Sequence, residues 1–202
     1  MLSIILTVVF FACAAYLGVE LSRAVCANIT PLDGAPPLGQ PPVVVLVAAG
    51  ALLGALLVTV GAQPMQLGAF AIVVLALAAC WSSDSLCGIV PDVFTLVPLG
   101  ALLILALTRG NWLTVASSAI AFAPFALAAW TTHGRGMGWG DAKLVALAGA
   151  ALGAPLAIFA MIVACVAAVV GYKIKGIKAG PIAFAPYIAA VVGAALPLAV
   201  GR

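Results

Sequence analysis

Long apolar runs, broken only by short stretches that contain Pro, Gly or charged residues, constrain this chain more than any other feature. A helix of about 20 apolar residues crosses a bilayer and satisfies its backbone hydrogen bonds internally. Eight candidate spans lie at approximately residues 2–24, 43–61, 67–82, 93–107, 112–131, 142–154, 156–172 and 182–200. The sequence therefore predicts an all-α integral membrane protein with one domain over residues 1–202, a compact polytopic bundle of about eight transmembrane helices.

Composition agrees with this fold class. Hydrophobic residues make up 66% of the chain and charged residues 6%, whereas soluble domains carry about 25% charged residues. The net charge of +3 comes without a basic cluster outside the apolar runs, so the lipid bilayer is an expected partner and nucleic acid is not. The five cysteines are scattered without a C-x-x-C pair, so neither a metal site nor a disulfide framework is predicted.

Two features of the spans need interpretation. The first residues contain no Lys or Arg, so the first run reads as a retained span rather than a cleaved signal peptide. Only Ala154-Pro155 separates the sixth and seventh spans, and a single kinked helix is the alternative there. The stretch from Asp141 to Gly171 is too long for one span, which favours a tight turn between two helices.

Basic residues set the expected orientation of the bundle. If the segment after the first span is cytoplasmic, the inner side holds Arg23, Arg135, Lys143, Lys173, Lys175 and Lys178. The outer side then holds only Arg109 and Arg202. Six against two follows the positive-inside bias and predicts an N-terminus outside the cytoplasm.

Two aspartates lie at the ends of apolar runs, in a chain with only five acidic residues. Asp84 ends the third span and Asp141 opens the sixth, with two crossings between them. An even number of crossings returns the chain to the same face, so both are expected at the cytoplasmic boundary. Two carboxyl groups in one poorly hydrated site cannot both ionise readily, and one then acts as acid and the other as base around a shared water. This pattern indicates peptide-bond hydrolysis without a metal or a covalent nucleophile.

Other readings stay open at this point. An aspartate before a helix is most often an N-cap, which applies to Asp141 and more strongly to Asp92. The alternative function is a small ion-coupled transporter or channel that uses Asp84 and Asp141 as pathway carboxylates. A third is a membrane acyltransferase, but only Arg135 and Lys143 lie near the glycine loop to hold a phosphate. The sequence does not favour nucleophilic catalysis. His133 has no convincing triad partner, and no base lies near Ser82, Ser83 and Ser85.

Three motifs resemble one known family. Gly138-Trp139-Gly140-Asp141-Ala142-Lys143-Leu144 is similar to the G-x-G-D-x-K-L signature of type IV prepilin peptidases, which are bacterial GxGD aspartic membrane proteases. The stretch from Asp84 to Pro91-Asp92 resembles the first catalytic segment of that family. Pro181-Ile182-Ala183-Phe184-Ala185-Pro186 resembles its late Pro-x-x-x-x-Pro segment. Order and spacing agree over roughly residues 67–200, which is the expected catalytic core.

The resemblance implies a function. Asp84 and Asp141 would be the catalytic pair of an aspartic endopeptidase that needs no cofactor and no metal. Gly136, Gly138 and Gly140 would shape the loop beside the site, and Lys143 would supply a supporting charge. The family removes the leader peptide from type IV prepilins or pseudopilins at the cytoplasmic face of the bacterial inner membrane. The pilus assembly machinery would then act in the same pathway.

Two departures from the family pattern refine this expectation. Ser85, Leu86, Cys87 and Gly88 stand where basic residues usually follow the first aspartate, which affects leader recognition. Large members carry paired C-x-x-C motifs in a cytoplasmic loop linked to N-methylation, whereas the corresponding loop here, residues 26–42, has only Cys26. The sequence therefore predicts a peptidase without N-methyltransferase activity, similar to the short branch that serves Flp, or tight-adherence, pili.

Overall fold

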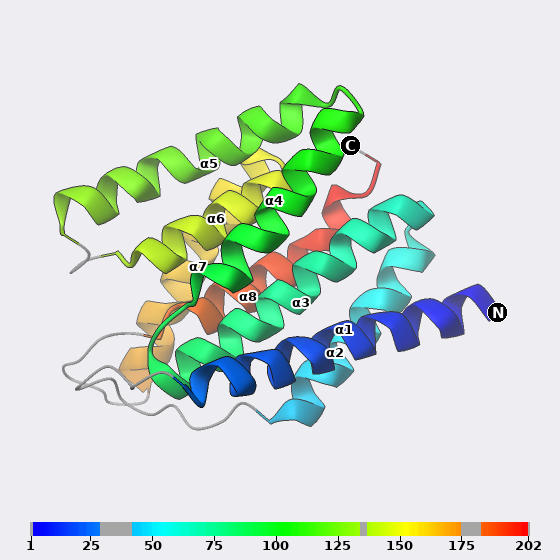
Figure 1. Ribbon diagram of the computed structural model, residues 1–202, viewed down its shortest axis with the longest axis horizontal. Helices are drawn as coiled ribbons and strands as arrows, with labels where there is room; N and C mark the ends of the chain where they lie inside the picture. Colours follow the sequence, from blue (N-terminus) through cyan, green and yellow to red (C-terminus); the bar gives the residue numbers. More distant parts are fainter. Residues whose placement is uncertain (1, 29–41, 134–136, 175–182, 202) are drawn as a thin grey trace.

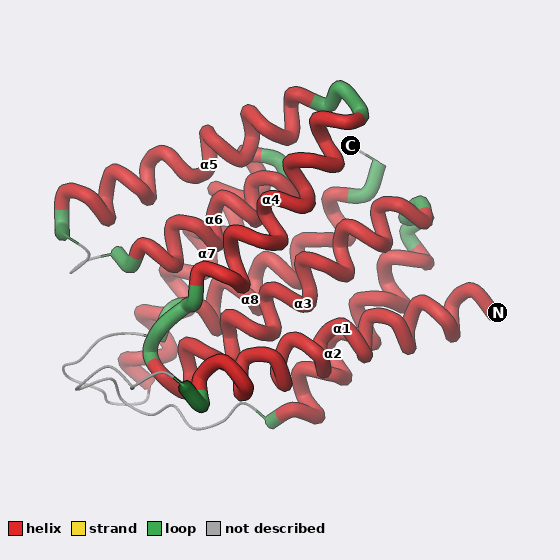
Figure 2. Tube along the Cα trace, viewed as in Figure 1, coloured by secondary structure: helices red, strands yellow, loops and turns green. Residues whose placement is uncertain are grey.

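The computed structural model describes residues 2–28, 42–133, 137–174 and 183–201. Regular structure in these ranges is entirely helical (Figure 2). The elements are α1 (Leu2–Cys26), α2 (Val43–Thr59), α3 (Pro64–Cys87), α4 (Asp92–Thr108), α5 (Trp112–Thr131), α6 (Trp139–Leu152), α7 (Ala154–Ile174), α8 (Ala185–Ala195) and the 3-10 helix η1 (Leu196–Ala199). The predicted class, a polytopic all-helical bundle with eight helices, is confirmed.

Helix length and composition fit a membrane environment. Four helices, α1, α3, α5 and α7, are long and apolar enough to cross a membrane, while α2, α4 and α8 with η1 are shorter apolar helices. Many large apolar side chains point outward, including Leu113 and Val44, which are 80% and 78% exposed. An outer surface of this kind is stable in lipid rather than in water.

Successive helices run in alternating directions, so the first residues of α1 and the end of η1 lie at the same end of the bundle (Figure 1). At the opposite end α1, α3, α5 and α7 finish and α4, α6 and α8 begin (Figure 1). We call this the carboxylate end, because Asp84 lies in the last turn of α3 and Asp141 in the first turn of α6. The prediction that an even number of crossings returns both aspartates to one end of the bundle therefore agrees with the helix directions.

The helices form two groups that meet along α3, α4, α6 and α8. In the first, α1 packs against both α2 and α3; in the second, α6 packs against α4, α5 and α7. Helix α8 contacts α3, α6 and α7 and so touches both groups. Small residues permit the closest approaches: a Cβ at Gly54 would lie 2.9 Å from the Thr7 carbonyl oxygen of α1. These contacts produce a continuous core of Ala, Val, Leu and Phe side chains.

Helix boundaries differ from the sequence prediction at three places. Helix α3 continues past the expected end at residue 82 to Cys87, because Ser82 and Ser83 are fully buried and helical and only Gly88, at φ 66°, terminates the helix. Helix α8 begins at Ala185 rather than 182 and gives way to η1 at Leu196. The polar end of α3 stays helical because its serines are buried by tertiary packing, which local sequence rules do not include.

The third difference concerns α6 and the turn after it. Helix α6 begins at Trp139, so Asp141 lies inside its first turn and the N-cap is Gly138. The N-cap reading of Asp141 is therefore wrong. Helices α6 and α7 are separate, and Gly153 at φ 79° forms the turn between them, as the preferred interpretation required.

Candidate active site

Asp84 is buried at the carboxylate end, with 8% of its surface exposed. Its Oδ2 accepts a hydrogen bond from the backbone N–H of Ala185, the first residue of α8, over 2.9 Å. A carboxylate near the C-terminus of its own helix is unfavourable, but the N-terminus of α8 offers a backbone donor and the favourable end of a helix dipole.

The start of α8 is itself held in place by α7. The Ala183 N–H donates to the Tyr172 hydroxyl oxygen over 3.0 Å. Gly171 lies directly against the ring of Tyr187, where a Cβ would overlap the phenol. Two α7 residues thus fix the segment that supplies the donor to Asp84. Nothing local in the sequence links these tyrosines to the aspartate, so no role was predicted for them.

Asp141 occupies the third position of α6, where its carboxyl group lies close to Gly138, the N-cap of the helix. An ideal Cβ at Gly138 would lie 3.1 Å from Asp141 Oδ2, so a side chain there would crowd the carboxyl group. The first turn of a helix favours negative charge, as does the start of α8 at Asp84. Each carboxyl group therefore lies near the N-terminus of a helix: that of Asp141 at the start of its own helix α6, and that of Asp84 at the start of α8.

The two carboxyl groups interact with each other. Asp84 acts electrostatically on Asp141, and both act on the buried Cys80 thiol one turn before Asp84. Helices α3 and α6 are in direct contact. Asp84 is buried and Asp141 is partly buried, and neighbouring carboxyl groups in such surroundings do not readily carry two negative charges. The arrangement could therefore hold one proton between the two groups.

The glycines of the predicted site loop have separate roles. A Cβ at Gly140 would lie 2.8 Å from the Val90 Cβ and 3.2 Å from the Val90 carbonyl oxygen. Gly140 thus admits the connector between α3 and α4 to close contact with α6. Gly138 makes room for the Asp141 carboxyl group. Gly136 lies outside the described residues.

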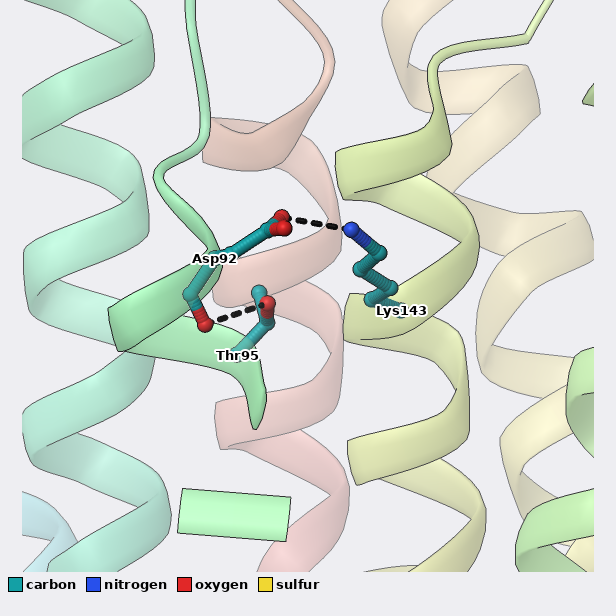
Figure 3. A network of polar contacts seen from close by, with 3 residues as sticks. All are labelled: Asp92, Thr95 and Lys143. Carbon is teal, nitrogen blue, oxygen red and sulfur yellow. Dashed lines mark hydrogen bonds and ion pairs between the residues drawn. The ribbon is translucent and has the colours of Figure 1, made fainter. Parts of the chain in front are cut away.

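The predicted role of Asp92 as a cap is wrong. Pro91 is the N-cap of α4, and no side-chain cap hydrogen bond forms there. Instead the Asp92 carboxylate forms an ion pair with Lys143 of α6, with 2.5 Å between Oδ1 and Nζ (Figure 3). Thr95 Oγ1 donates to the Asp92 carbonyl oxygen over 3.2 Å (Figure 3). Lys143, predicted only as a supporting charge, therefore joins two helices.

Other candidate side chains lie apart from this arrangement. His133 is exposed at the end of α5, at φ 51°. Ser83 donates to the Cys80 carbonyl, and the Ser82 hydroxyl is buried without a hydrogen-bond partner. The thiols of Cys26 and Cys87 are close enough to interact at the ends of α1 and α3, a proximity the sequence did not reveal. Among the described residues, no group of three or more His, Cys, Asp or Glu side chains could hold a metal ion.

With this geometry established, comparison with known proteins identifies the family. A family model described as the type IV leader peptidase family matches residues 69–172, about half of the chain. The chain belongs to the type IV leader peptidase family. The match includes both aspartates and the Asp92–Lys143 pair. No curated protein and no solved structure gave a match, so the family model carries this assignment.

Because it belongs to this family, the chain is a leader-peptidase-like protease. Its described residues fold as a helical bundle. The resemblance to the type IV prepilin peptidase family is confirmed, and the match covers the G-x-G-D and Asp84–Asp92 segments. The late proline segment lies beyond the match, and its first residues, Pro181 and Ile182, lie outside the described residues. The match starts inside α3 and stops in α7, so α1, α2 and α8 lie outside it. All three of those helices nevertheless contact α3, the helix that carries Asp84.

Proposed function

We propose that this leader peptidase is an aspartic endopeptidase in which Asp84 and Asp141 jointly activate one water. The observation that carries the proposal is the electrostatic interaction between two carboxyl groups, one at the N-terminus of α8 and the other in the first turn of α6. Asp84 accepts a hydrogen bond from the Ala185 N–H over 2.9 Å. Hydrogen bonds to a carboxylate favour its charged form, so Asp84 is the ionised partner and Asp141 carries the shared proton.

The proposed reaction balances with these two groups alone. Asp84 takes a proton from water while the water oxygen attacks the scissile carbonyl carbon. Asp141 gives its proton to the developing oxyanion, which forms a neutral tetrahedral intermediate. Collapse breaks the C–N bond as the proton taken up by Asp84 passes to the leaving amine, and Asp141 recovers its proton from the collapsing hydroxyl group.

The proposed substrates are type IV prepilins or pseudopilins, which join a leader peptide to a hydrophobic helix. A bundle with an apolar outer surface and its acid–base pair at one end suits a substrate that lies partly in the bilayer. We place this end at the cytoplasmic face of a bacterial inner membrane, because six of the eight basic residues then fall inside. The pilus assembly machinery would receive the product.

Purified full-length chain, reconstituted with a prepilin, tests this function. We expect mass spectrometry to show loss of the leader and an unmethylated new N-terminus, and we expect EDTA to leave the rate unchanged. A single-span protein without a leader is the control and should stay intact. Absence of cleavage together with ion flux would support the transporter reading instead, and inhibition by EDTA would contradict the aspartic mechanism.

A further inference from the structure

We propose that the Asp92–Lys143 ion pair positions Asp141 relative to Asp84, by holding the beginning of α4 against the beginning of α6. The inference rests on the proposed function and adds two positioning residues to it. Neither side chain is assigned to the reaction itself. Lys143 follows Asp141 by two residues, and the connector that ends at Asp92 starts one turn after Asp84.

The ion pair joins parts of the chain that are 51 residues apart. Figure 3 shows the Lys143 amine extending from α6 toward the Asp92 carboxylate at the first turn of α4. The Thr95 hydroxyl bonds to the Asp92 carbonyl oxygen and stabilises that turn. Thr95 is fully buried, so the backbone at Asp92 has little freedom to move.

A second contact, one turn away along α6, also holds the beginning of α6 in place. Gly140 lies directly against Val90, the residue two positions before Asp92. Residues three apart on a helix face the same side, so Gly140 and Lys143 both meet the α3–α4 connector. Two contacts one turn apart fix the rotation of α6 about its axis as well as its distance from the connector. Asp141 lies between these two residues in sequence, so the rotation of α6 sets the direction in which the Asp141 side chain points.

The energy of the ion pair favours a positioning role over a stabilising one. The Asp92 side chain is 62% exposed and that of Lys143 is 22% exposed. Ion pairs open to solvent contribute about 0–1 kcal/mol to stability. Misplacement of a catalytic group by about 1 Å, in contrast, costs up to about 100-fold in rate. Loss of the pair should therefore affect cleavage more than folding.

The test uses the full-length chain and its prepilin substrate, with Asp92→Asn, Lys143→Met, the double variant and the charge exchange Asp92→Lys with Lys143→Asp. We expect each single change to lower kcat about 10- to 100-fold with little change in KM. The double variant should be no slower than either single, and the exchange should recover part of the loss. Glu20→Gln, which removes a partner of the Arg23–Glu20 pair on α1, is the matched control and should keep full activity.

Hydrogen exchange of the segment around residues 138–144 supplies a readout that does not depend on cleavage. Exchange there should accelerate in Asp92→Asn and Lys143→Met and stay unchanged in Glu20→Gln. Wild-type kcat in Asp92→Asn, independent effects that multiply in the double variant, or unchanged exchange would each overturn the inference. Failure of the wild-type chain to cleave would instead count against the proposed function and leave the exchange result to decide the positioning role.

Discussion

The helices that carry the two aspartates are held in different ways. Helix α3, with Asp84, packs against α1 through close backbone contact, since a Cβ at Gly18 would overlap the Leu75 carbonyl oxygen. Helix α6, with Asp141, packs against α5 through a glycine contact of the same kind at Gly149 and also through a buried hydrogen bond from Ser118 Oγ to the Ala146 carbonyl, 3.0 Å long. Helix α6 is therefore held by close packing and also by a specific hydrogen bond.

This comparison shows that the matched family region is not a self-contained structural unit. Helix α6 and its partners α4 and α5 lie inside residues 69–172. Helix α3 depends on α1, and Asp84 depends on the Ala185 N–H, and both supports lie outside that range. One aspartate is therefore held from within the matched region and the other from outside it, which the following substitutions test.

The largest effect is expected at the α1–α3 contact. Gly18→Leu would force α1 away from α3, because no space exists even for a Cβ. Overpacking of this kind costs about 1–3 kcal/mol or more, and displacement of α3 should abolish cleavage. Thermal unfolding in detergent and prepilin cleavage measure both effects. Gly68→Leu, at a position with nothing within 4 Å, is the control and should retain cleavage.

A smaller effect is expected where the α3–α4 connector meets α6. Gly140→Ala places a Cβ 2.8 Å from the Val90 Cβ, so the connector or the first turn of α6 must shift. We expect a roughly 10-fold lower kcat from misalignment, and little loss of stability because Ala is a better helix former by about 1 kcal/mol. The compensating variant Val90→Gly, which removes the Cβ that the new methyl group would meet, should restore part of the rate, and its failure to do so would contradict the steric explanation.

The hydrogen bond between α5 and α6 should contribute less. Ser118→Ala removes the donor to the Ala146 carbonyl in a buried site. The free energy of unfolding should fall by about 1 kcal/mol, with kcat nearly unchanged because Asp141 lies more than one turn away. Chemical denaturation in mixed micelles measures the loss. A large fall in kcat would show that the α5–α6 contact, too, controls the site.

The smallest effect is expected on α4 at Gly100, which has no atom within 4 Å of an added Cβ. Gly100→Ala should leave cleavage unchanged and raise stability by up to about 1 kcal/mol, because Ala loses less backbone entropy in a helix. The same unfolding assay applies. A lower stability would mean that another surface covers this position in the membrane.

Most of the fold could be predicted from the sequence, because apolar runs with Pro or Gly between them determine helix positions directly. The even number of crossings between Asp84 and Asp141 also required no structure. Long-range partners could not be found in this way. The Ala185 N–H lies 101 residues from Asp84, and Lys143 lies 51 residues from Asp92. Nothing in the local pattern distinguishes a capping aspartate from one that pairs with another helix.

The same limit explains the errors at Asp141 and Asp92. Local rules place an aspartate before a helix as its N-cap, whereas Gly138 and Pro91 occupy those positions here. Close approach by Val90 requires Gly140, and that requirement becomes visible only when the connector is placed in space. The sequence therefore identified the residue types of the site, and the packing of the bundle determines their partners.

The central claim is that Asp84 and Asp141, supplied by two helix groups, form one catalytic unit. The most direct test compares prepilin cleavage by the wild-type chain, Asp84→Asn, Asp141→Asn and the double variant at equal levels of membrane-inserted protein. Asn keeps the volume and removes the exchangeable proton, so each single variant should lose at least about 100-fold in kcat, and the double variant should be no worse. Substantial cleavage by either single variant would contradict the account.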